Sequence, residues 1–188
     1  MMRRELFFFL IIFSACSNIK DDAIGPNGSN SLFKKLSSRE TGIDFINTIS
    51  TTSELNVFRY RNFYNGGGVG IGDFNNDGLT DVFLTSNLGD NKLFLNKGNW
   101  KFEDITMSAG VKGVKAWSTG VSIVDINADG LLDIYVCNAG DIKGDNRENE
   151  LFINNGDLTF TERAAEYGLA DKGFSTHAVF FDYDKDGD

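Results

Sequence analysis

One acidic loop occurs three times in this 188-residue chain, and its regular recurrence restricts the possible folds more than any other feature. The copies begin at Asp73, Asp125 and Asp182, a period of roughly fifty residues that is typical of stacked repeat units. Each copy has Asp or Asn at loop positions 1, 3 and 5 and Gly at position 6, and the first two copies add Asp at position 9. The spacing therefore predicts a repeated structural unit that carries one acidic loop.

These loops have the chemistry of a site for a hard divalent cation. Calcium takes about six to eight oxygen ligands, and carboxylates, amide oxygens and backbone carbonyls can all supply them. A glycine at position 6 permits the sharp turn that brings the carbonyl of position 7 toward the ion. Since the pattern occurs three times, chance is a poor explanation, and we predict that the loops bind Ca²⁺.

The segments that flank the loops read as short β-strands. Residues 81–86 and 133–138 are apolar, β-branched or aromatic, and similar runs follow at 91–96 and 149–154. A turn and one more short strand complete each unit. Four antiparallel strands in a unit of roughly fifty residues predict an all-β fold made of β-propeller blades. The expected blade units are about residues 66–106, 117–164 and 174–188, the last of them truncated.

The segment 32–43 resembles the ends of the two complete units. Its Phe33 and Gly42 match Phe102 with Gly110 and Phe160 with Gly168. We expect it to be the closing strand of a ring whose last blade comes from sequence downstream of residue 188. Residues 32–188 would then hold about two and a half blades of a longer propeller. An open stack of sheets or a β-solenoid is the alternative architecture.

The N-terminal residues read as an export signal. Arg3 and Arg4 precede an apolar run that is too short to span a bilayer, and small residues lead to Cys16. We predict that residues 1–16 form a lipoprotein signal peptide ending at lipidated Cys16; ordinary secretion is the alternative. Residues 17–31 read as a flexible tether. A Lys-Asp-Asp tract at residues 20–22 favours an outer-membrane lipoprotein at the cell surface, held to the membrane only by its lipid.

The loops and the glycine-rich stretch 58–72 resemble the FG-GAP/VCBS repeat family of calcium-loop propellers, particularly the bacterial lipoproteins of the cartilage acidic protein/UnbV type. The resemblance covers residues 32–188. It implies a ring of commonly seven blades, with the loop between the first two strands of a blade. It also implies three sets of Ca²⁺ ligands. They are Asp73, Asn75, Asp77 and Asp81 with the Leu79 carbonyl; Asp125, Asn127, Asp129 and Asp133 with the Leu131 carbonyl; and Asp182, Asp184 and Asp186 with the Asp188 carbonyl.

The formal net charge of −9, without a basic stripe, argues against nucleic acid as a partner. We expect calcium to stabilise the fold rather than to catalyse a reaction, and we do not expect an enzyme. His177 reads as a surface or packed histidine, and Cys137 reads as a core residue.

Recognition of an extracellular glycan or protein is the preferred function, because aromatic and basic side chains precede the first strands of the blades. The candidates are Trp117, Tyr60, Tyr64, Arg59 and Arg61, together with the polar insert Ala139–Asn149. Packing between blades is the alternative role for the aromatic residues. The alternative function is an accessory domain of a secreted enzyme whose catalytic residues lie downstream of residue 188.

Overall fold

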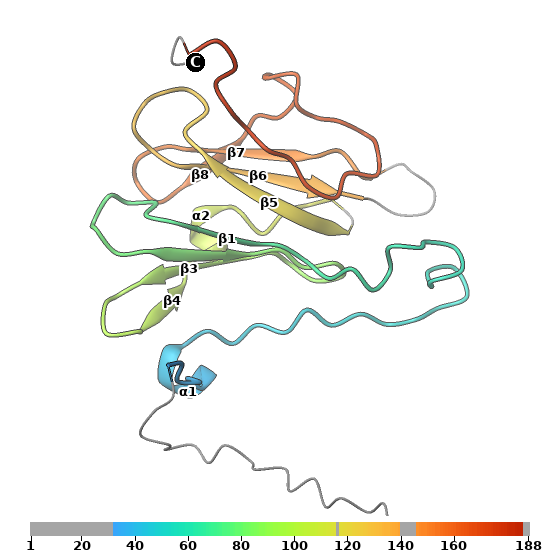
Figure 1. Cartoon of the computed structure of the whole chain (residues 1–188), viewed down its shortest axis with the longest axis horizontal. Helices are drawn as coiled ribbons and strands as arrows, with labels where there is room; N and C mark the ends of the chain where they lie inside the picture. Colours follow the sequence, from blue (N-terminus) through green and yellow to red (C-terminus); the bar gives the residue numbers. More distant parts are fainter. Residues whose placement is uncertain (1–31, 116, 140–145, 186–188) are drawn as a thin grey trace, which may run out of the picture. The chain divides into compact units, whose positions relative to one another are not determined.

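The computed structural model describes residues 32–115, 117–139 and 146–185 (Figure 1). The chain divides into two units, and the strands all lie in the unit that begins at Leu36. The first sheet contains β1 (Val69–Gly72), β2 (Asp81–Leu84), β3 (Lys92–Asn96) and β4 (Phe102–Asp104). The second contains β5 (Ser118–Val124), β6 (Asp133–Asn138), β7 (Glu150–Asn154) and β8 (Phe160–Glu162). The helices are α1 (Ser38–Thr41) and α2 (Thr106–Ala109).

Each sheet is a four-stranded antiparallel meander in which the strands pair in sequence order. Gly72 pairs with Asp81, and Val124 pairs with Asp133, so each acidic loop connects the first two strands of its sheet. The two units predicted at 66–106 and 117–164 therefore contain the four strands expected of each. The prediction of an all-β fold made of four-stranded antiparallel blades is confirmed.

The main hydrophobic core lies between the two sheets. Phe83 and Leu93 of the first sheet pack with Ile134, Val136 and Phe152 of the second. Removal of a side chain of this size from water contributes about 1.5–3 kcal/mol. Since neither sheet could bury this face alone, the two units stabilise each other in the way expected for neighbouring blades.

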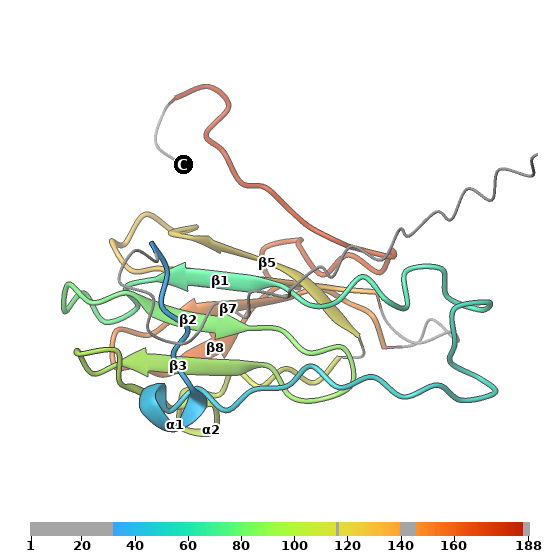
Figure 2. The same ribbon diagram turned by 60° about the horizontal axis from the view of Figure 1, so that its bottom comes forward.

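The first strands of the two sheets, β1 and β5, lie side by side (Figures 1 and 2). The hydroxyl of Thr85, the residue after β2, donates to the Thr119 carbonyl of β5 at 2.5 Å and so ties the two sheets together. A Cβ at Gly70 would come within 2.8 Å of the Ile123 side chain. Glycine at this position thus allows the second sheet to approach the backbone of β1.

The third predicted unit forms no strand in residues 174–185. This segment does lie along the second sheet, because Gly120 N–H donates to the Thr176 carbonyl at 2.9 Å and the Ser122 hydroxyl donates to the Ala178 carbonyl at 2.5 Å. A strand needs a hydrogen-bonded neighbour along its length. The described residues contain no second strand of this unit, so the segment remains irregular.

The segment predicted as a closing strand, 32–43, also forms no strand. The short helix α1 occupies Ser38–Thr41, with Ser37 as its N-cap, and Gly42 ends it with a φ of 85°. The closing strand was expected to pair with blades beyond residue 188, so it stays a prediction, as does the number of blades in the ring.

The predicted signal peptide, Cys16 and the tether fall outside the described residues. No helix in the described part of the chain has the length and apolar character needed to cross a membrane.

Candidate metal centre

The first two acidic loops have the same backbone conformation. Position 4 is left-handed in both, with φ of 56° at Asn76 and at Ala128, and so is position 6, with φ of 85° at Gly78 and at Gly130. Glycine adopts this conformation freely, whereas a residue with a Cβ does so at a cost. Position 4 was not identified from the sequence. The Asn at position 76 was a usable signal, because Asn tolerates the left-handed region, but Ala128 gave none.

The carboxylates at positions 1 and 5 fold back onto the loop backbone. Asp73 accepts hydrogen bonds from Asp77 N–H at 3.1 Å and from Gly78 N–H at 2.7 Å. Asp77 accepts from Leu79 N–H at 2.8 Å and from the Asn75 side-chain amide at 3.0 Å. The second loop repeats these four bonds at Asp125, Asp129 and Asn127, with distances of 2.8–3.0 Å.

The carboxylate at position 9 is fully buried and braces two parts of the blade. Asp81 accepts from Phe74 N–H at 3.0 Å and from Asn96 N–H at 2.7 Å, so it connects the loop to the end of β3. Asp133 does the same with Ile126 N–H at 3.1 Å and Asn154 N–H at 2.8 Å. The position 9 residue therefore supports the fold directly, in addition to its predicted role as a ligand.

The acidic groups of each loop lie close enough to influence one another. Burial raises the pKa of Asp81, the two backbone N–H bonds lower it, and the charges of Asp77 and Asp73 raise it further. Asp133 has a raised pKa for the same reasons, with Asp129 and Asp125 as its charged neighbours. The net upward shift therefore has burial as its main cause, with the neighbouring charges of the loop as a smaller one.

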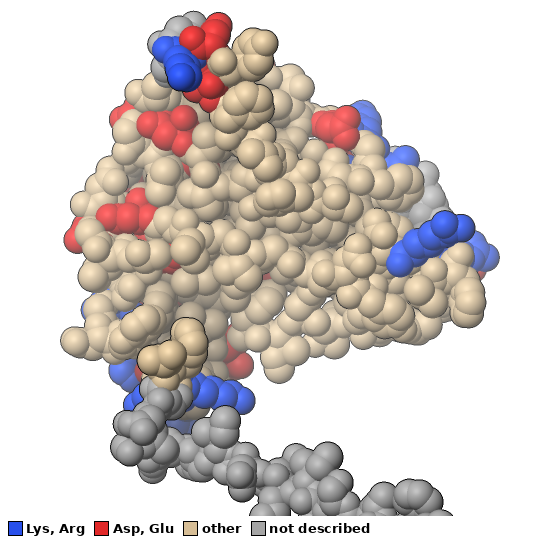
Figure 3. Space-filling view, in the orientation of Figure 1, with Lys and Arg blue, Asp and Glu red and all other residues tan. Residues whose placement is uncertain are grey.

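The loops of neighbouring blades also contact each other. The Asn76 side-chain amide donates to the Gly130 carbonyl at 3.2 Å, and the Asn154 side-chain amide donates to the Phe74 carbonyl at 2.8 Å. Acidic side chains show along the edge of the molecule where these loops project (Figures 1 and 3). The two predicted sites therefore lie on the same edge of the paired sheets.

The donor set of each complete loop fits calcium in its chemistry. Three carboxylates, one amide oxygen and one carbonyl are all hard oxygen ligands, and a carboxylate oxygen that accepts one N–H bond keeps a second lone pair. Among the described residues, no three His, Cys, Asp or Glu side chains converge tightly enough to hold a metal ion.

The third loop is described only in part. Asp182 and Asp184 are exposed, and Asp182 accepts from Lys185 N–H at 2.5 Å. Lys185, at position 4, is left-handed like its counterparts, with a φ of 64°. The remaining predicted ligands, Asp186 and Asp188, lie outside the described residues.

The predicted recognition residues have different environments. Trp117 is only 3% exposed and packs against Phe63 and Tyr60, with ring centroids 5.2 and 5.5 Å apart, so it belongs to the core. Arg59 forms an exposed ion pair with Glu54 at 3.2 Å. Tyr64 is 66% exposed and Arg61 is exposed as well. Part of the polar insert, residues 140–145, lies outside the described residues.

A depression of about 300 Å³ lies beside the first strands of the two sheets. Its lining includes Tyr60, Asn62, Thr119, His177 and the glycines 66–68. His177 is exposed and lies next to Gly120, where a Cβ would approach its Nδ1 to 2.7 Å. This depression therefore places Tyr60, one of the predicted recognition residues, near the amide of Asn62, the hydroxyl of Thr119 and the imidazole of His177.

Cys137 lies in β6 and is 1% exposed. Burial, with a smaller contribution from the charge of Asp171, raises the pKa of its thiol to about 11. The reactive thiolate is therefore scarce near neutral pH, which agrees with the core role predicted for this residue.

The fold and the loops together define a β-propeller-like module with an acidic loop in each blade. Residues 73–136 match the FG-GAP-like repeat, from the first position of loop one through the whole of loop two. The chain is 30% identical to cartilage acidic protein 1 of Xenopus tropicalis over 151 residues, which is 80% of this chain and 22% of that protein. It is 31% identical to cartilage acidic protein 1 of Mus musculus over 115 residues, 61% of this chain and 17% of that protein.

The chain thus spans about a fifth of the length of these relatives. Both complete loops lie inside the matched region, so residues 73–136 carry an FG-GAP-like repeat.

Proposed function

We propose that this chain is a calcium-stabilised β-propeller module that recognises an extracellular glycan or protein. The observation that carries the calcium part is the duplicated loop. Two loops fifty-odd residues apart in the sequence share the same left-handed positions and the same hydrogen bonds from the same side-chain positions. Such a repeat of geometry supports one role for both loops.

The charge of the loops supports a structural role for the cation. Burial raises the pKa of the aspartate at position 9, and the charges of the two other carboxylates in the loop raise it further, so each loop holds like charges close together. A divalent ion would reduce this repulsion and, because the unfolded chain has no formed site, would stabilise the folded state. Asp125, Asn127, Asp129 and Asp133 would hold the ion in the second loop, with the Leu131 carbonyl.

Thermal unfolding with and without calcium tests this role. Added calcium should raise the melting temperature of the wild-type chain relative to chelator, and Asp125→Asn should reduce that increase. Asp90→Asn is the matched control, because Asp90 is an exposed acid outside the loops. An equal calcium effect in both variants would contradict binding at the second loop.

The recognition part is supported by the depression that Tyr60, Asn62 and His177 line. An aromatic ring with neutral hydrogen-bonding groups suits a sugar or a polar peptide segment. Calorimetric titration with a panel of glycans tests the sugar alternative: Asn62→Ala should weaken any binding that uses this depression. Absence of heat with every glycan would leave a protein ligand as the remaining form of the proposal.

We also propose that the module acts without catalysis and is attached to the cell surface through lipid on Cys16. The buried thiol of Cys137, with its raised pKa, supports a non-catalytic role for that residue. Metabolic labelling with a fatty acid, compared between wild type and Cys16→Ser, tests the attachment. An accessory role beside catalytic residues downstream of residue 188 is the alternative, and hydrolase assays on the full-length protein separate the two.

A further inference from the structure

A second cavity, of about 310 Å³, lies between the two blades and away from the acidic loops. The segment from α2 to Lys115 forms one wall, and β7 and β8 form the other. Glu150 and Phe152 of β7 and Glu162 of β8 line the second wall. Phe152 pairs directly with Glu162 in the sheet, so these three side chains lie on the same face. Glu150 is 1% exposed, whereas Glu162 is exposed, so the cavity has one acid at its floor and one toward solvent.

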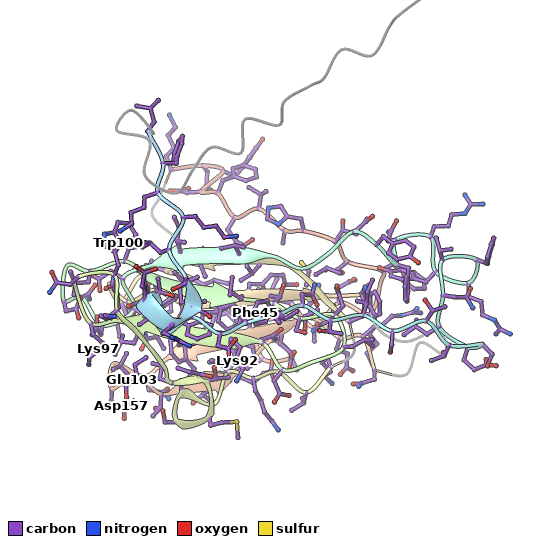
Figure 4. The ribbon with its side chains drawn as sticks, turned by 90° about the horizontal axis from the view of Figure 1, so that it is seen from below. Phe45, Lys92, Lys97, Trp100, Glu103 and Asp157 are labelled. Atoms are coloured by element: carbon purple, nitrogen blue, oxygen red, sulfur yellow. The ribbon has the colours of Figure 1, made fainter. Side chains whose placement is uncertain are left out.

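The first blade has a residue of opposite charge, Lys92, at the position that corresponds to Glu150. Asn91-Lys92-Leu93 aligns with Asn149-Glu150-Leu151, and Asp104 holds the place of Glu162, since it pairs with Phe94 as Glu162 pairs with Phe152. In the first blade, Lys92 and Asp104 form an ion pair at 2.9 Å; Lys92 is labelled in Figure 4. The second blade thus has two carboxyl groups where the first has a balanced pair.

The hydrogen-bond donors around Glu150 favour its ionised form. Val114 N–H donates to one carboxylate oxygen at 3.0 Å, and the Asn138 side-chain amide donates to the other at 3.2 Å. An ionised carboxylate accepts such bonds on both oxygens, whereas a protonated one needs an acceptor of its own. Burial raises the pKa of Glu150 and outweighs these two bonds, which lower it, and the charge of Glu162 adds to the net rise.

One further buried donor faces this region. Asn91 is 1% exposed, and its amide nitrogen has no acceptor among the described residues. The side-chain oxygen of Asn91 accepts from Ser86 N–H at 3.0 Å, so the amide nitrogen points away from Ser86. A Cβ at Gly113, which lines the cavity, would lie 2.7 Å from this nitrogen and 3.2 Å from a Glu150 oxygen. This nitrogen lies near the buried carboxylate, but as a donor it needs an acceptor, so it does not itself favour a cation.

The nearby basic groups do not supply a positive partner for Glu150. Lys115 donates to Glu148, which Lys172 also contacts at 3.0 Å, and the influence of Lys115 on Glu150 is the smallest of those acting on its pKa. Lys112 lies on the exposed rim, where water screens its charge. A buried carboxylate without a positive partner is unfavourable, so the site is incomplete as it stands.

We propose that this cavity binds a small ligand group that carries a protonated amine, placed between Glu150 and Glu162 with its alkyl part against Phe152. The amine would take the role that Lys92 has in the first blade. Its source is either a free alkylamine or the lysine side chain of a peptide. The inference is independent of the calcium loops and of the depression near Tyr60.

The test follows backbone amide chemical shifts of the full chain at neutral pH with calcium present. Titration with n-butylammonium should shift the Gly113 and Val114 amides saturably, while n-butanol, its neutral counterpart, should leave them unchanged. Acetyl-Gly-Lys-Gly-amide and its norleucine counterpart distinguish the sources: the lysine peptide should bind if a peptide side chain is accepted, and only n-butylammonium should bind if the cavity takes free amines.

Three variants locate the site. Glu162→Gln should weaken n-butylammonium binding about tenfold, because one charge-assisted contact is lost. Glu103→Gln is the control, since Glu103 lies on β4 of the first sheet (Figure 4) and should bind as wild type does. Glu150→Lys should abolish binding by installing the first blade's ion pair, and its spectrum reports whether the fold is kept. Equal shifts with n-butanol, undiminished binding in Glu162→Gln, or no response to either amine would overturn the proposal.

Discussion

The buried aspartates at position 9 allow a sharp test of how the acidic loops are built. Asp133 is fully buried and accepts two backbone N–H bonds, from Ile126 and Asn154. The substitution Asp133→Asn keeps the shape but replaces one acceptor oxygen with a donor nitrogen. One of the two buried N–H groups then faces another donor and loses its partner.

The expected loss can be estimated from that single change. A buried donor left without an acceptor costs about 1–3 kcal/mol. Removal of a buried charge that has a raised pKa recovers part of this, so we expect Asp133→Asn to lower the free energy of unfolding by about 2 kcal/mol. Asp125→Asn should cost at most about 1 kcal/mol, because its donors, Asp129 and Gly130, are exposed and water can replace the lost bond.

Urea denaturation in chelator measures both variants without any contribution from calcium. The free energy of unfolding comes from linear extrapolation. Asp133→Asn should be the less stable variant of the two. Equal losses in both variants, or no loss in Asp133→Asn, would refute the reasoning that position 9 supports the fold before any ion binds.

Three further predictions concern single residues. Ala128→Gly should raise the free energy of unfolding by about 0.5–1 kcal/mol, because glycine adopts the left-handed conformation of this position without the cost that alanine has. Gly130→Ala should lower the free energy of unfolding for the opposite reason. Denaturant titration measures both variants, and a change of the same sign in both would contradict this reasoning. Hydrogen bonds from Lys115 and Lys172 lower the pKa of Glu148 from 4.5 to about 2. Its stabilising contribution is therefore full above about pH 4.5 and lost as the pH falls toward 2, so the stability difference between wild type and Glu148→Gln should shrink over that range; a difference independent of pH would exclude this ion pair as its cause. A thiol reagent should modify Cys137 only as fast as the protein unfolds, given its burial and raised pKa, and rapid modification of the native chain would show that this part of β6 opens freely.

The repeat was readable from the sequence because its signals are local. Strand composition, turns and the loop pattern repeat with one period, so both sheets and the position of the loops between first and second strands were predicted. The closing strand and the third blade could not be tested, because a strand depends on a neighbour that the described residues do not contain. Trp117 was a candidate for a binding surface, with packing as the alternative, and the sequence could not decide between them because the contacts with Phe63 and Tyr60 depend on how distant segments pack.

The double role of Asp81 and Asp133 was missed for a similar reason. The loop pattern identifies them as oxygen donors, but their N–H partners include Asn96 and Asn154, at the ends of β3 and β7. The pair Glu150 and Glu162 did leave a signal in the sequence, since Lys92 is the aligned residue of the other blade. Only the structure shows that the substitution falls in a cavity.

The most direct test of the calcium role is a crystal structure of the protein grown with calcium. Electron density for an ion should appear in the second loop, at about 2.3–2.6 Å from oxygens of Asp125, Asn127 and Asp129 and from the Leu131 carbonyl. A well-ordered loop at saturating calcium that keeps only its internal N–H bonds, with no ion among these oxygens, would contradict the account.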